Sequence, residues 1–311
     1  MAWIIDHQKT ALVILPISPE DIAKHVNNLT GGLAEKPPKF ESAIALTLTD
    51  ALISPLISLI HNTTLIIVPH GILNYLPFAV LSSNQEKQFL IEDYAIAYAP
   101  SVSALSSIRA LQNPNENRLL ALGNPRGDLL NAGSEVKAIA KSYPKATIFL
   151  REQATEDQIY AHAGRIDILH LSAHGVLQGR NPLFSSIELA PAVDGDPDGY
   201  LTVQEIYGLD LSGANLVVLS ACKTARGGQS PGDEFIGLTR AFLYAGAPAV
   251  ITTLWSVADD STALLMESFY KHLQSGEPAV QALKQAQVKM VEEGYSPYQW
   301  VAFMLTGNDQ E

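Results

Sequence analysis

Residues 216–228, with the sequence LVVLSACKTARGG, contain the clearest change from strand to loop in the chain. Their first five residues form a short apolar run with β-branched side chains, which is typical of a strand buried on both faces of a parallel sheet. The only cysteine of the chain, Cys222, follows this run, and a polar loop with Gly227 and Gly228 comes next. Because open α/β sheets bind ligands at the carboxyl ends of their strands, the sequence predicts that the thiol lies at a binding edge.

A second segment of the same kind lies upstream, at residues 166–175, with the sequence IDILHLSAHG. Its apolar residues predict another buried strand, and His174 and Gly175 follow the end of that strand. We therefore expect both strands to present a reactive side chain at one edge of the sheet. The separation of 48 positions between His174 and Cys222 agrees with the spacing of about 50 residues between the histidine and the cysteine of caspases.

Strand and helix patterns alternate regularly from residue 118 onward. The predicted strands lie at residues 118–123, 146–150, 166–172, 216–220, 249–254 and 300–305. The predicted helices lie at residues 133–142, 155–163, 202–206, 234–245, 262–274 and 278–292. Such a rhythm is typical of a parallel sheet whose strands are joined by right-handed helical crossovers, so the predicted fold class is α/β.

The first part of the chain is less regular. Predicted strands lie at residues 10–16, 65–69 and 89–98, and predicted helices at residues 18–30 and 41–60. Pro55 is expected to kink the second of these helices. Turn-forming residues replace all periodicity at residues 113–117, NPNEN, which makes this segment the best candidate domain boundary. We therefore predict an N-terminal accessory half at residues 1–114 and a catalytic half at residues 115–311.

The composition indicates an ordinary globular protein, with 47% hydrophobic and 17% charged residues among 311. The 32 acidic and 20 basic residues give a net charge of −12, which opposes the binding of a polyanion. Nucleic acid is therefore not expected as a direct partner.

The compartment is predicted from the cysteine count and from the absence of targeting signals. One cysteine cannot form an internal disulfide, and a free thiol fits a reducing compartment. The first residues lack the basic start, apolar core and cleavage site of a secretory signal. The most apolar long segment, residues 44–60, is too polar and too short to span a bilayer. We therefore expect a cytoplasmic protein without membrane contact.

Five motifs follow one another along the chain. They are HLSAHG at residues 170–175, PLFSSIEL at 182–189, GYLTVQEIYGLDLSGANLVVLSACKTARGG at 199–228, GDEFIGLTRAFLYAGAPAVITTLWSV at 232–257 and YQWVAFMLTG at 298–307. In this order they resemble the motifs of the CHAT domain, a caspase-like peptidase domain related to caspases and separases. The resemblance covers about residues 65–307 and implies a caspase-like, mostly parallel sheet flanked by helices. It also implies an N-terminal accessory α/β half that is a degenerate copy of the catalytic half, a pseudo-caspase.

Relatives often carry tetratricopeptide repeats ahead of this domain. The sequence shows none of that repeat pattern. This fits either a free-standing member of the family or a longer protein that has been trimmed.

The resemblance implies a cysteine endopeptidase that cleaves a protein or peptide substrate through an acyl-thioester. Cys222 would be the nucleophile, and His174 would accept its proton and return it to the departing amine. The backbone amides of Gly175 and Cys222 would bind the oxyanion of the tetrahedral intermediate. This chemistry needs no metal or other cofactor. Related peptidases are held off until a partner protein or a cleavage rearranges their loops, so the isolated chain is expected to have low activity.

Five residues are predicted to bind the substrate. Asp233 and Glu234 follow the cysteine loop and are placed to hold a basic side chain, as in related arginine-cutting peptidases. Glu234 also fits the start of a helix, where a negative charge is favourable. Trp255, Ser256 and Val257 end the next predicted strand and resemble the caspase loop that pairs with an extended peptide.

Other interpretations of the same residues stay open. An unpaired cysteine is often simply buried, and a scaffold would keep the fold and bind a partner without cutting it. The presence of both His174 and Cys222 argues against the scaffold, although Ala225 stands where relatives commonly carry glycine and would alter the loop. An acyltransferase or ligase would use the same thioester. His170 and His174 suggest a metal pair, but no third or fourth ligand lies nearby in the sequence, so His170 is interpreted as a core residue.

Overall fold

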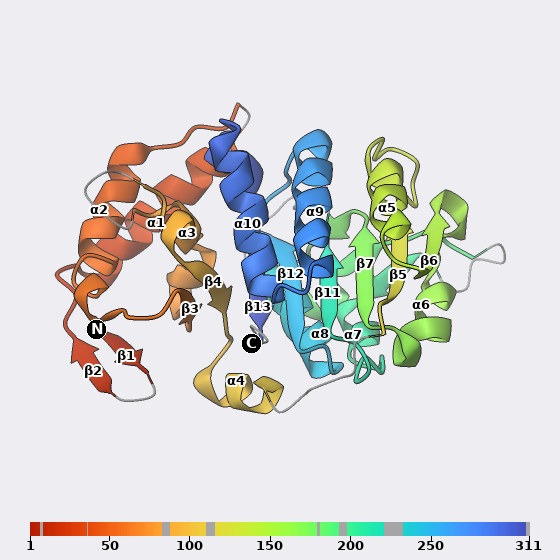
Figure 1. Ribbon diagram of the computed structural model, residues 1–311, viewed down its shortest axis with the longest axis horizontal. Coiled ribbons are helices and arrows are strands. Elements are labelled where there is room, and N and C mark those ends of the chain that lie inside the picture. Colours follow the sequence, from red (N-terminus) through yellow and green to blue (C-terminus); the bar gives the residue numbers. More distant parts are fainter. Residues whose placement is uncertain are drawn as a thin grey trace.

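The computed structural model describes residues 1–6, 9–35, 37–82, 88–109, 116–178, 181–192, 198–220 and 233–308. Within these residues, eight strands form one sheet in the order β3-β4-β13-β12-β11-β7-β5-β6 (Figure 1). The strands are β3 (Thr64–Ile67), β4 (Ala95–Tyr98), β5 (Arg118–Gly123), β6 (Lys145–Leu150), β7 (Ile168–Ser172), β11 (Leu216–Leu219), β12 (Ala249–Thr253) and β13 (Phe303–Gly307).

The strands of this sheet run mostly parallel. Within the described part of this sheet, β12 and β13 form the only antiparallel pair of neighbours. The pairs that link β3, β4 and β13 are parallel, and so are those that link β12, β11, β7, β5 and β6. The carboxyl ends of β5, β7, β11 and β12 therefore meet at one edge. The predicted α/β class, with a mostly parallel sheet flanked by helices, is confirmed.

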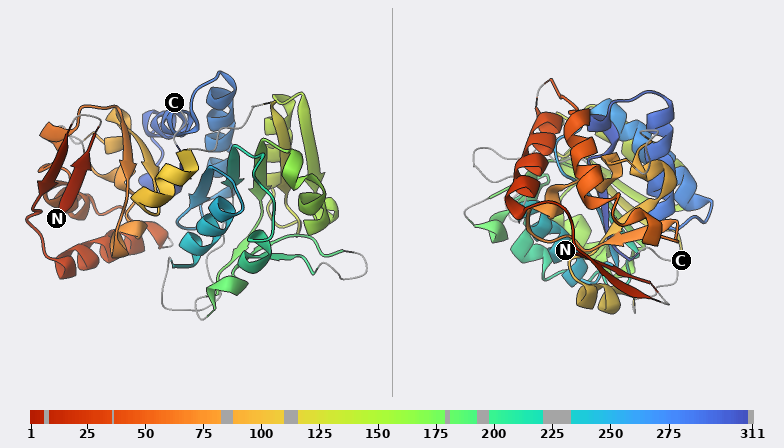
Figure 2. Two further views of the ribbon diagram at one scale, coloured as in Figure 1. Left: turned by 90° about the horizontal axis from the view of Figure 1, so that it is seen from below. Right: turned by 90° about the vertical axis from the view of Figure 1, so that its left-hand side faces the viewer.

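Helices cover both faces of the sheet (Figure 2). One face packs against α5 (Ala132–Lys141), α9 (Asp259–Gln274) and α10 (Ala279–Glu292), and the other against α6 (Glu156–His162), α7 (Val203–Ile206) and α8 (Asp233–Tyr244). Successive strand residues alternate between the two cores, since Ile168 and Val218 belong to the first and Leu169 and Val217 to the second. This alternation is the pleat of strands buried on both faces, which explains why their sequences are apolar throughout.

The N-terminal part adds a hairpin and further helices. The hairpin pairs β1 (Ala2–Ile5) with β2 (Thr10–Val13), and the helices are α1 (Pro19–Ala34), α2 (Ser42–Leu52), α3 (Leu90–Asp93) and α4 (Val102–Arg109). The side-chain oxygen of Ser18 caps α1 by accepting a hydrogen bond from the N–H of Asp21. The helix predicted over residues 41–60 is shorter than expected, because α2 ends at Leu52, ahead of Pro55, whose ring does not fit a helix interior.

Shorter elements complete the fold. A second sheet, in the order β10-β9-β8, contains β8 (Gly175–Val176), β9 (Ser186–Glu188) and β10 (Tyr200–Thr202). Single turns of 3-10 helix are η1 (Ile57–Leu59), η2 (Gly71–Tyr75), η3 (Phe78–Val80), η4 (Arg151–Gln153), η5 (Ala163–Arg165) and η6 (Pro182–Phe184). Among the described residues, no helix combines the length and the apolar character that crossing a bilayer would require.

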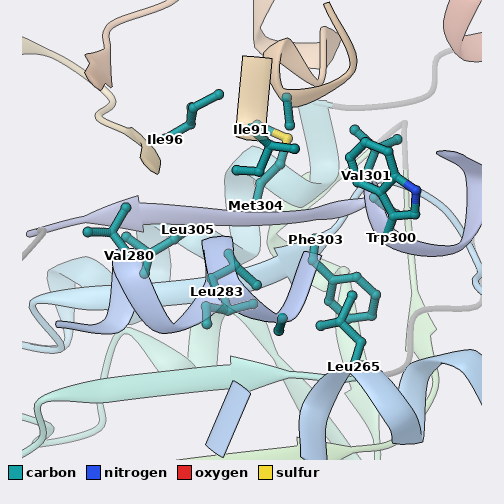
Figure 3. Packing of buried hydrophobic residues seen from close by; sticks show 14 of the residues in the cluster. Ile91, Ile96, Leu265, Val280, Leu283, Trp300, Val301, Phe303, Met304 and Leu305 are labelled. Carbon is teal, nitrogen blue, oxygen red and sulfur yellow. The ribbon is translucent and has the colours of Figure 1, made fainter. Parts of the chain in front are cut away.

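The strand β13 lies inside the main sheet, between β4 and β12. The strand expected at residues 300–305 begins later, because the short helix α11 (Pro297–Trp300) comes first and β13 starts at Phe303. Trp300 and Phe303 are buried in the core around β13 (Figure 3). Since β4 pairs with β13, one sheet spans both predicted halves of the chain. The boundary predicted at residues 113–117 lies partly outside the described residues, so the division at residue 114 stays a prediction.

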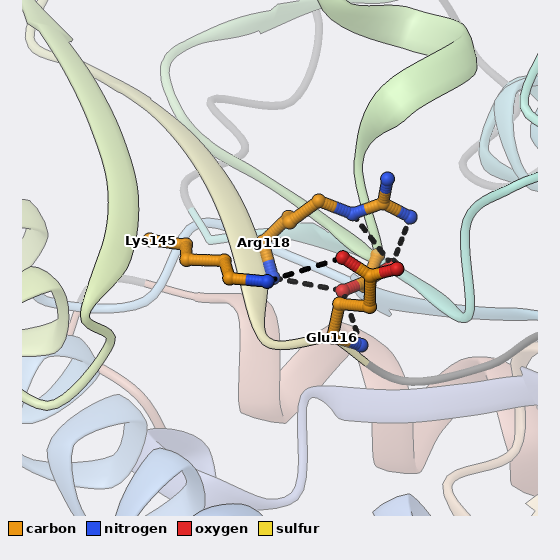
Figure 4. Close-up of polar contacts among 4 residues, drawn as sticks. Glu116, Arg118 and Lys145 are labelled. Carbon is orange, nitrogen blue, oxygen red and sulfur yellow. Dashed lines mark hydrogen bonds and ion pairs between the residues drawn. The ribbon is translucent and has the colours of Figure 1, made fainter.

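A buried carboxylate joins β5 and β7 at the amino edge of the sheet. Asp167 is fully buried and accepts hydrogen bonds from the backbone N–H groups of Glu116 and Arg118 at 2.9 and 2.8 Å. The guanidinium of Arg118 donates to its other oxygen at 2.7 Å, and Lys145 pairs with Glu116 at 3.1 Å (Figure 4). Charge-assisted bonds of this kind are among the strongest in proteins. They fix the register of β5 relative to β7. The same register sets the relative positions of the two strand ends at the carboxyl edge.

A second buried carboxylate is expected to make stability depend on pH. Glu156, at the start of α6, is fully buried, and its Oε1 accepts a hydrogen bond from the N–H of Gly199 at 3.0 Å. Burial, together with the nearby charge of Glu205, raises the pKa of Glu156 from 4.5 to about 7. The unfolded chain therefore loses this proton first as the pH rises. The stability due to the protonated carboxyl is complete below pH 4.5 and is lost as the pH approaches 7.

We therefore expect the free energy of unfolding of the Glu156→Gln variant to fall less than that of the wild type over this pH window. The difference should be about 2 kcal/mol, because a tenfold difference in proton affinity between the folded and unfolded chain corresponds to about 1.4 kcal/mol and partial hydration reduces the total. Urea unfolding at a series of pH values measures it. Glu152→Gln, on the exposed turn before α6, is the control. If the free energies of unfolding of the wild type and of Glu156→Gln changed equally with pH, the prediction would be contradicted.

Candidate active site

The carboxyl edge of the sheet brings together the segments that were predicted to carry the chemistry. β11 ends beside β7, where Ser220 donates its N–H to the carbonyl of Leu171 at 2.9 Å. His174 lies two residues beyond the end of β7. Cys222 lies outside the described residues, with the rest of residues 221–232, and the chain enters that segment from Ser220. The position of the sulfur therefore stays a prediction.

The ring of His174 is held by a carboxylate that was not predicted from the sequence. The side chain of His174 is 7% exposed, and its Nε2 lies 2.9 Å from both oxygens of Asp128. Because an ionised carboxylate can only accept a hydrogen bond, Nε2 carries the ring proton and donates a hydrogen bond to Asp128. In the neutral ring, Nδ1 then holds the free lone pair, and it is buried without a hydrogen-bond partner among the described residues. This is the tautomer in which Nδ1 can act as a general base.

A tight loop after β5, with the sequence NPRGD at residues 124–128, brings Asp128 to this position. Asn124 has a φ of 54°, and its N–H donates to the carbonyl of Ser172 at 2.9 Å, which ties the loop to the end of β7. Gly127 has a φ of 79° and donates its N–H to the carbonyl of Asn124 at 3.1 Å. Asparagine and glycine are the residues that tolerate such a left-handed backbone best. The local sequence is thus suited to the loop.

A second group of contacts joins the same loop to β9. Arg126 pairs with Glu188 at 2.9 Å and lies over the ring of Tyr200, 5.5 Å from its centre. The N–H of Glu188 donates to the carbonyl of His174 at 2.7 Å. Both partners of the ion pair are two-thirds or more buried, so solvent screens it less than a fully exposed pair. The contacts therefore fix the loop that carries Asp128 relative to the strand beside His174.

The amide of Gly175, predicted as an oxyanion donor, points away from β9. Gly175 lies opposite Ile187 in the antiparallel pair of β8 and β9. The hydrogen bond from Glu188 to the carbonyl of His174 makes this a pair that exchanges no hydrogen bonds of its own. The N–H of Gly175 is therefore directed outward from the ladder, which is compatible with the predicted role. The amide of Cys222 lies outside the described residues.

Three predicted substrate-binding residues follow β12 at the same edge. Trp255 is 4% exposed, and its Nε1 donates to the carbonyl of Tyr298 at 3.0 Å. The carbonyl of Ser256 accepts a hydrogen bond from the hydroxyl of Tyr298 at 3.0 Å, and Val257 is partly buried. The side chain of Trp255 thus belongs to the core, whereas Ser256 and Val257 are partly exposed.

The other two predicted substrate-binding residues, Asp233 and Glu234, begin α8. A helix that follows a strand of a parallel sheet starts at the carboxyl edge, which is the edge of the candidate site. Further along α8, Leu238 and Phe242 are fully buried in the core. The side chains of Asp233 and Glu234 lie outside the described residues, so their role stays a prediction.

Comparison with known proteins assigns the chain to a family. The sequence profile described as CHAT domain matches residues 42–308. The chain belongs to the CHAT domain family. This CHAT domain is similar to tetratricopeptide repeat protein 28 of Homo sapiens, with 25% identity over 346 aligned residues, and to the protein of that name from Mus musculus, with 24% identity. The alignments cover 90% and 84% of this chain, whereas they span only 14% and 13% of the relatives.

Solved structures share the fold of this CHAT domain at low sequence identity. One is the separase of Saccharomyces cerevisiae in complex with securin, with a TM-score of 0.51, 17% identity, and coverage of 75% of this chain and 15% of that one. Another is the Arg-specific cysteine proteinase gingipain R, with a TM-score of 0.54, 10% identity, and coverage of 93% and 74%. At these identities the likeness concerns the fold alone. The predicted caspase-like fold of the CHAT domain is confirmed.

Proposed function

We propose that this CHAT domain is a caspase-like cysteine endopeptidase. The proposal rests on the buried ring of His174, whose Nε2–H is held by Asp128 and whose Nδ1 is left as a base. It is supported by the order of the strands, because the segment with Cys222 leaves β11, the direct neighbour of the strand that leads to His174. A reducing compartment, where a lone thiol stays free, is part of the proposal.

The reaction would proceed in two halves. Transfer of the thiol proton of Cys222 to Nδ1 of His174 gives the thiolate, which is needed because a free thiol is only a few per cent ionised at neutral pH. The sulfur attacks the peptide carbonyl carbon, and the amides of Gly175 and Cys222 bind the oxyanion. The C–N bond then breaks as His174 gives its proton to the leaving amine. In the second half, water loses a proton to His174 and attacks the acyl carbon. The C–S bond then breaks, the acid product leaves, and the sulfur takes the proton back from His174.

An activity-based probe tests the proposal. An acyloxymethyl ketone should label the wild type and should not label the Cys222→Ala variant, because the probe forms a thioether with an activated cysteine. Labelling is measured before and after limited proteolysis, since related peptidases are held off until their loops rearrange. Equal labelling of both proteins would overturn the proposal. A folded wild type that stays unlabelled in both states would favour a scaffold that binds its partner without cutting.

The specificity would come from Asp233, whose carboxylate we propose to hold a basic side chain at the cleavage site. Profiling against a diverse peptide library should then show arginine or lysine before the cut, and Asp233→Asn should reduce that preference about 10-fold or more, as for a buried or half-buried charge pair. Glu267→Gln, which changes an exposed carboxylate on α9, is the control. A library in which basic residues have no advantage would refute the role of Asp233.

Asp128 would act through His174 by holding its tautomer. Asp128→Asn is expected to lower kcat about 10- to 100-fold with little change in KM, because the amide can donate to the ring and so favour the wrong tautomer. The effect is expected to be smaller than that of a fully buried carboxylate, since the side chain of Asp128 is 51% exposed. Steady-state kinetics on a peptide cleaved by the wild type measures it. An unchanged kcat would show that Asp128 is not needed to orient the ring.

A further inference from the structure

A buried polar cluster lies on the face of the sheet that α5 and α9 cover, next to the carboxyl edge. It contains Glu135 of α5, His170 of β7, Tyr270 of α9 and Ser220 directly after β11, each at most 3% exposed. Nδ1 of His170 lies 3.0 Å from the hydroxyl of Tyr270, and Nε2 lies 2.9 Å from Oε1 of Glu135. The hydroxyl of Ser220 donates to the same Oε1. Four elements of the fold therefore meet at one carboxylate and one imidazole.

Burying this polar cluster in an apolar core lowers the stability of the fold. A buried carboxylate loses its hydration, and only a complete set of hydrogen bonds compensates for that loss. The cross-strand neighbours of His170, Ala121 and Val218, are apolar and offer no side-chain hydrogen bond. Among the described residues, Oε2 of Glu135 has no hydrogen-bond partner, and Nε2 of His170 is close to Oε1 without being aligned for a hydrogen bond. Incompletely paired groups of this kind in a core indicate a role other than stability.

The cluster contacts both strands at the point where they lead to the proposed catalytic residues. Ser220 precedes Cys222 by two residues, and His170 precedes His174 by four. Glu135 lies against both Ser220 and His170, so one carboxylate fixes the end of β11 relative to β7. Burial raises the pKa of Tyr270 well above its ordinary value, so its hydroxyl stays neutral and serves as a hydrogen-bond partner of His170.

We propose that Glu135 and Ser220 are positioning residues for Cys222. Their hydrogen bond fixes Ser220, the residue from which the chain continues to Cys222, relative to the strand that leads to His174. The catalytic consequence rests on the proposed function, whereas the reactivity of the thiol can be measured without it. Misplacing a reacting group by about 1 Å can lower a rate about 100-fold, so the loss of this hydrogen bond is expected to be visible in the rate.

The test compares Ser220→Ala with Ser172→Ala in the full chain. Ser172 stands two residues before His174 and is 1% exposed like Ser220, but its hydroxyl has no hydrogen-bond partner among the described residues. Because the chain has one cysteine, the rate of alkylation by iodoacetamide reports on Cys222 alone. We expect Ser220→Ala to lower this rate about 10-fold and Ser172→Ala to change it less than about twofold. Ser220→Thr, which keeps the hydroxyl, should restore the wild-type rate.

Equal alkylation rates for the two folded alanine variants would overturn the positioning role. If Ser220→Ala does not fold, Glu135→Gln replaces it. That variant keeps the volume and an acceptor but loses the charge, and it should slow alkylation at least about threefold. An unchanged rate in Glu135→Gln would also overturn the inference.

Peptide cleavage, measured in parallel, separates this inference from the proposed function. If both hold, Ser220→Ala lowers kcat about 10-fold and leaves KM unchanged, because only the placement of the nucleophile has changed. A slower alkylation in Ser220→Ala, with no cleavage by the wild type either before or after limited proteolysis, would reject the peptidase and keep the positioning role. Cleavage with a kcat that Ser220→Ala does not alter would keep the peptidase and reject the positioning role.

Discussion

Replacing His174 by alanine is expected to lower kcat/KM for a cleavable peptide by about 1,000-fold or more. The imidazole has two tasks in the proposed reaction, since it takes the proton of Cys222 and returns it to the leaving amine, and proton transfer by a positioned side chain contributes about 100- to 10,000-fold. The ring is buried and held by Asp128 in the tautomer that this transfer needs. The rate is measured with the peptide that the wild type cleaves best.

His272→Ala is the matched control for this experiment. His272 also pairs with a carboxylate, since its Nδ1 lies 2.8 Å from Oε1 of Glu277, but the pair lies at the end of α9 and not beside β7. Its replacement should leave kcat/KM within about twofold of the wild type, as expected for a surface pair. Losses of similar size in the two variants would mean that His174 acts through stability and not through chemistry.

Replacing Gly307 by alanine is expected to destabilise the fold by about 3–5 kcal/mol or to prevent folding. Gly307 has a φ of 123°, which L side chains rarely adopt, and it lies opposite Ala249 where β13 pairs with β12. A methyl group there would overlap the carbonyl oxygen of Pro248 and approach Cα of Ala249 to 3.0 Å. Both obstacles are backbone atoms at the start of β12, so β13 would have to move away from β12. Urea unfolding gives the loss in free energy.

Gly276→Ala separates the two causes of that loss. Gly276 has a φ of 91°, but a methyl group there would meet nothing within 4 Å. This variant carries the conformational penalty alone, which is expected to be about 1 kcal/mol. If both variants lost the same amount of stability, the close approach of β13 to β12 would not be the cause.

The strands around the candidate site could be predicted from the sequence because they are buried on both faces. The strand predicted at residues 118–123 has the same bounds as β5, and those predicted near residues 216 and 249 match β11 and β12 within one residue. Such runs need apolar residues at every position, which leaves a clear pattern. The strand predicted at residues 89–98 is only partly present, because the short helix α3 comes ahead of β4. The side chain of Glu92 accepts a hydrogen bond from the N–H of Phe89 and so stabilises the start of that helix. Short apolar runs do not distinguish a helix from a strand.

The candidate site was only half predictable. His174 follows a buried strand directly, and its position at the carboxyl edge follows from that alone. Asp128 also follows a predicted strand, but aspartate is common in loops after strands. Only the pairing of β5 with β7, and the left-handed backbone at Asn124 and Gly127, decide that this carboxylate reaches the histidine. Asparagine and glycine permit that backbone locally, but the strand pairing depends on contacts between distant parts of the chain, which a local pattern does not contain.

The position of β13 in the middle of the sheet has a consequence for folding during translation. β13 is the last described strand in the sequence, yet it lies between β4 and β12 in the middle of the sheet. Translation delivers the chain from its N-terminus, so two partial sheets exist first, each with an open edge of buried strand residues. Those edges invite pairing with other nascent chains until β13 fills the gap. The two partial sheets therefore join only after β13 has been translated, and truncations ahead of Phe303 should aggregate.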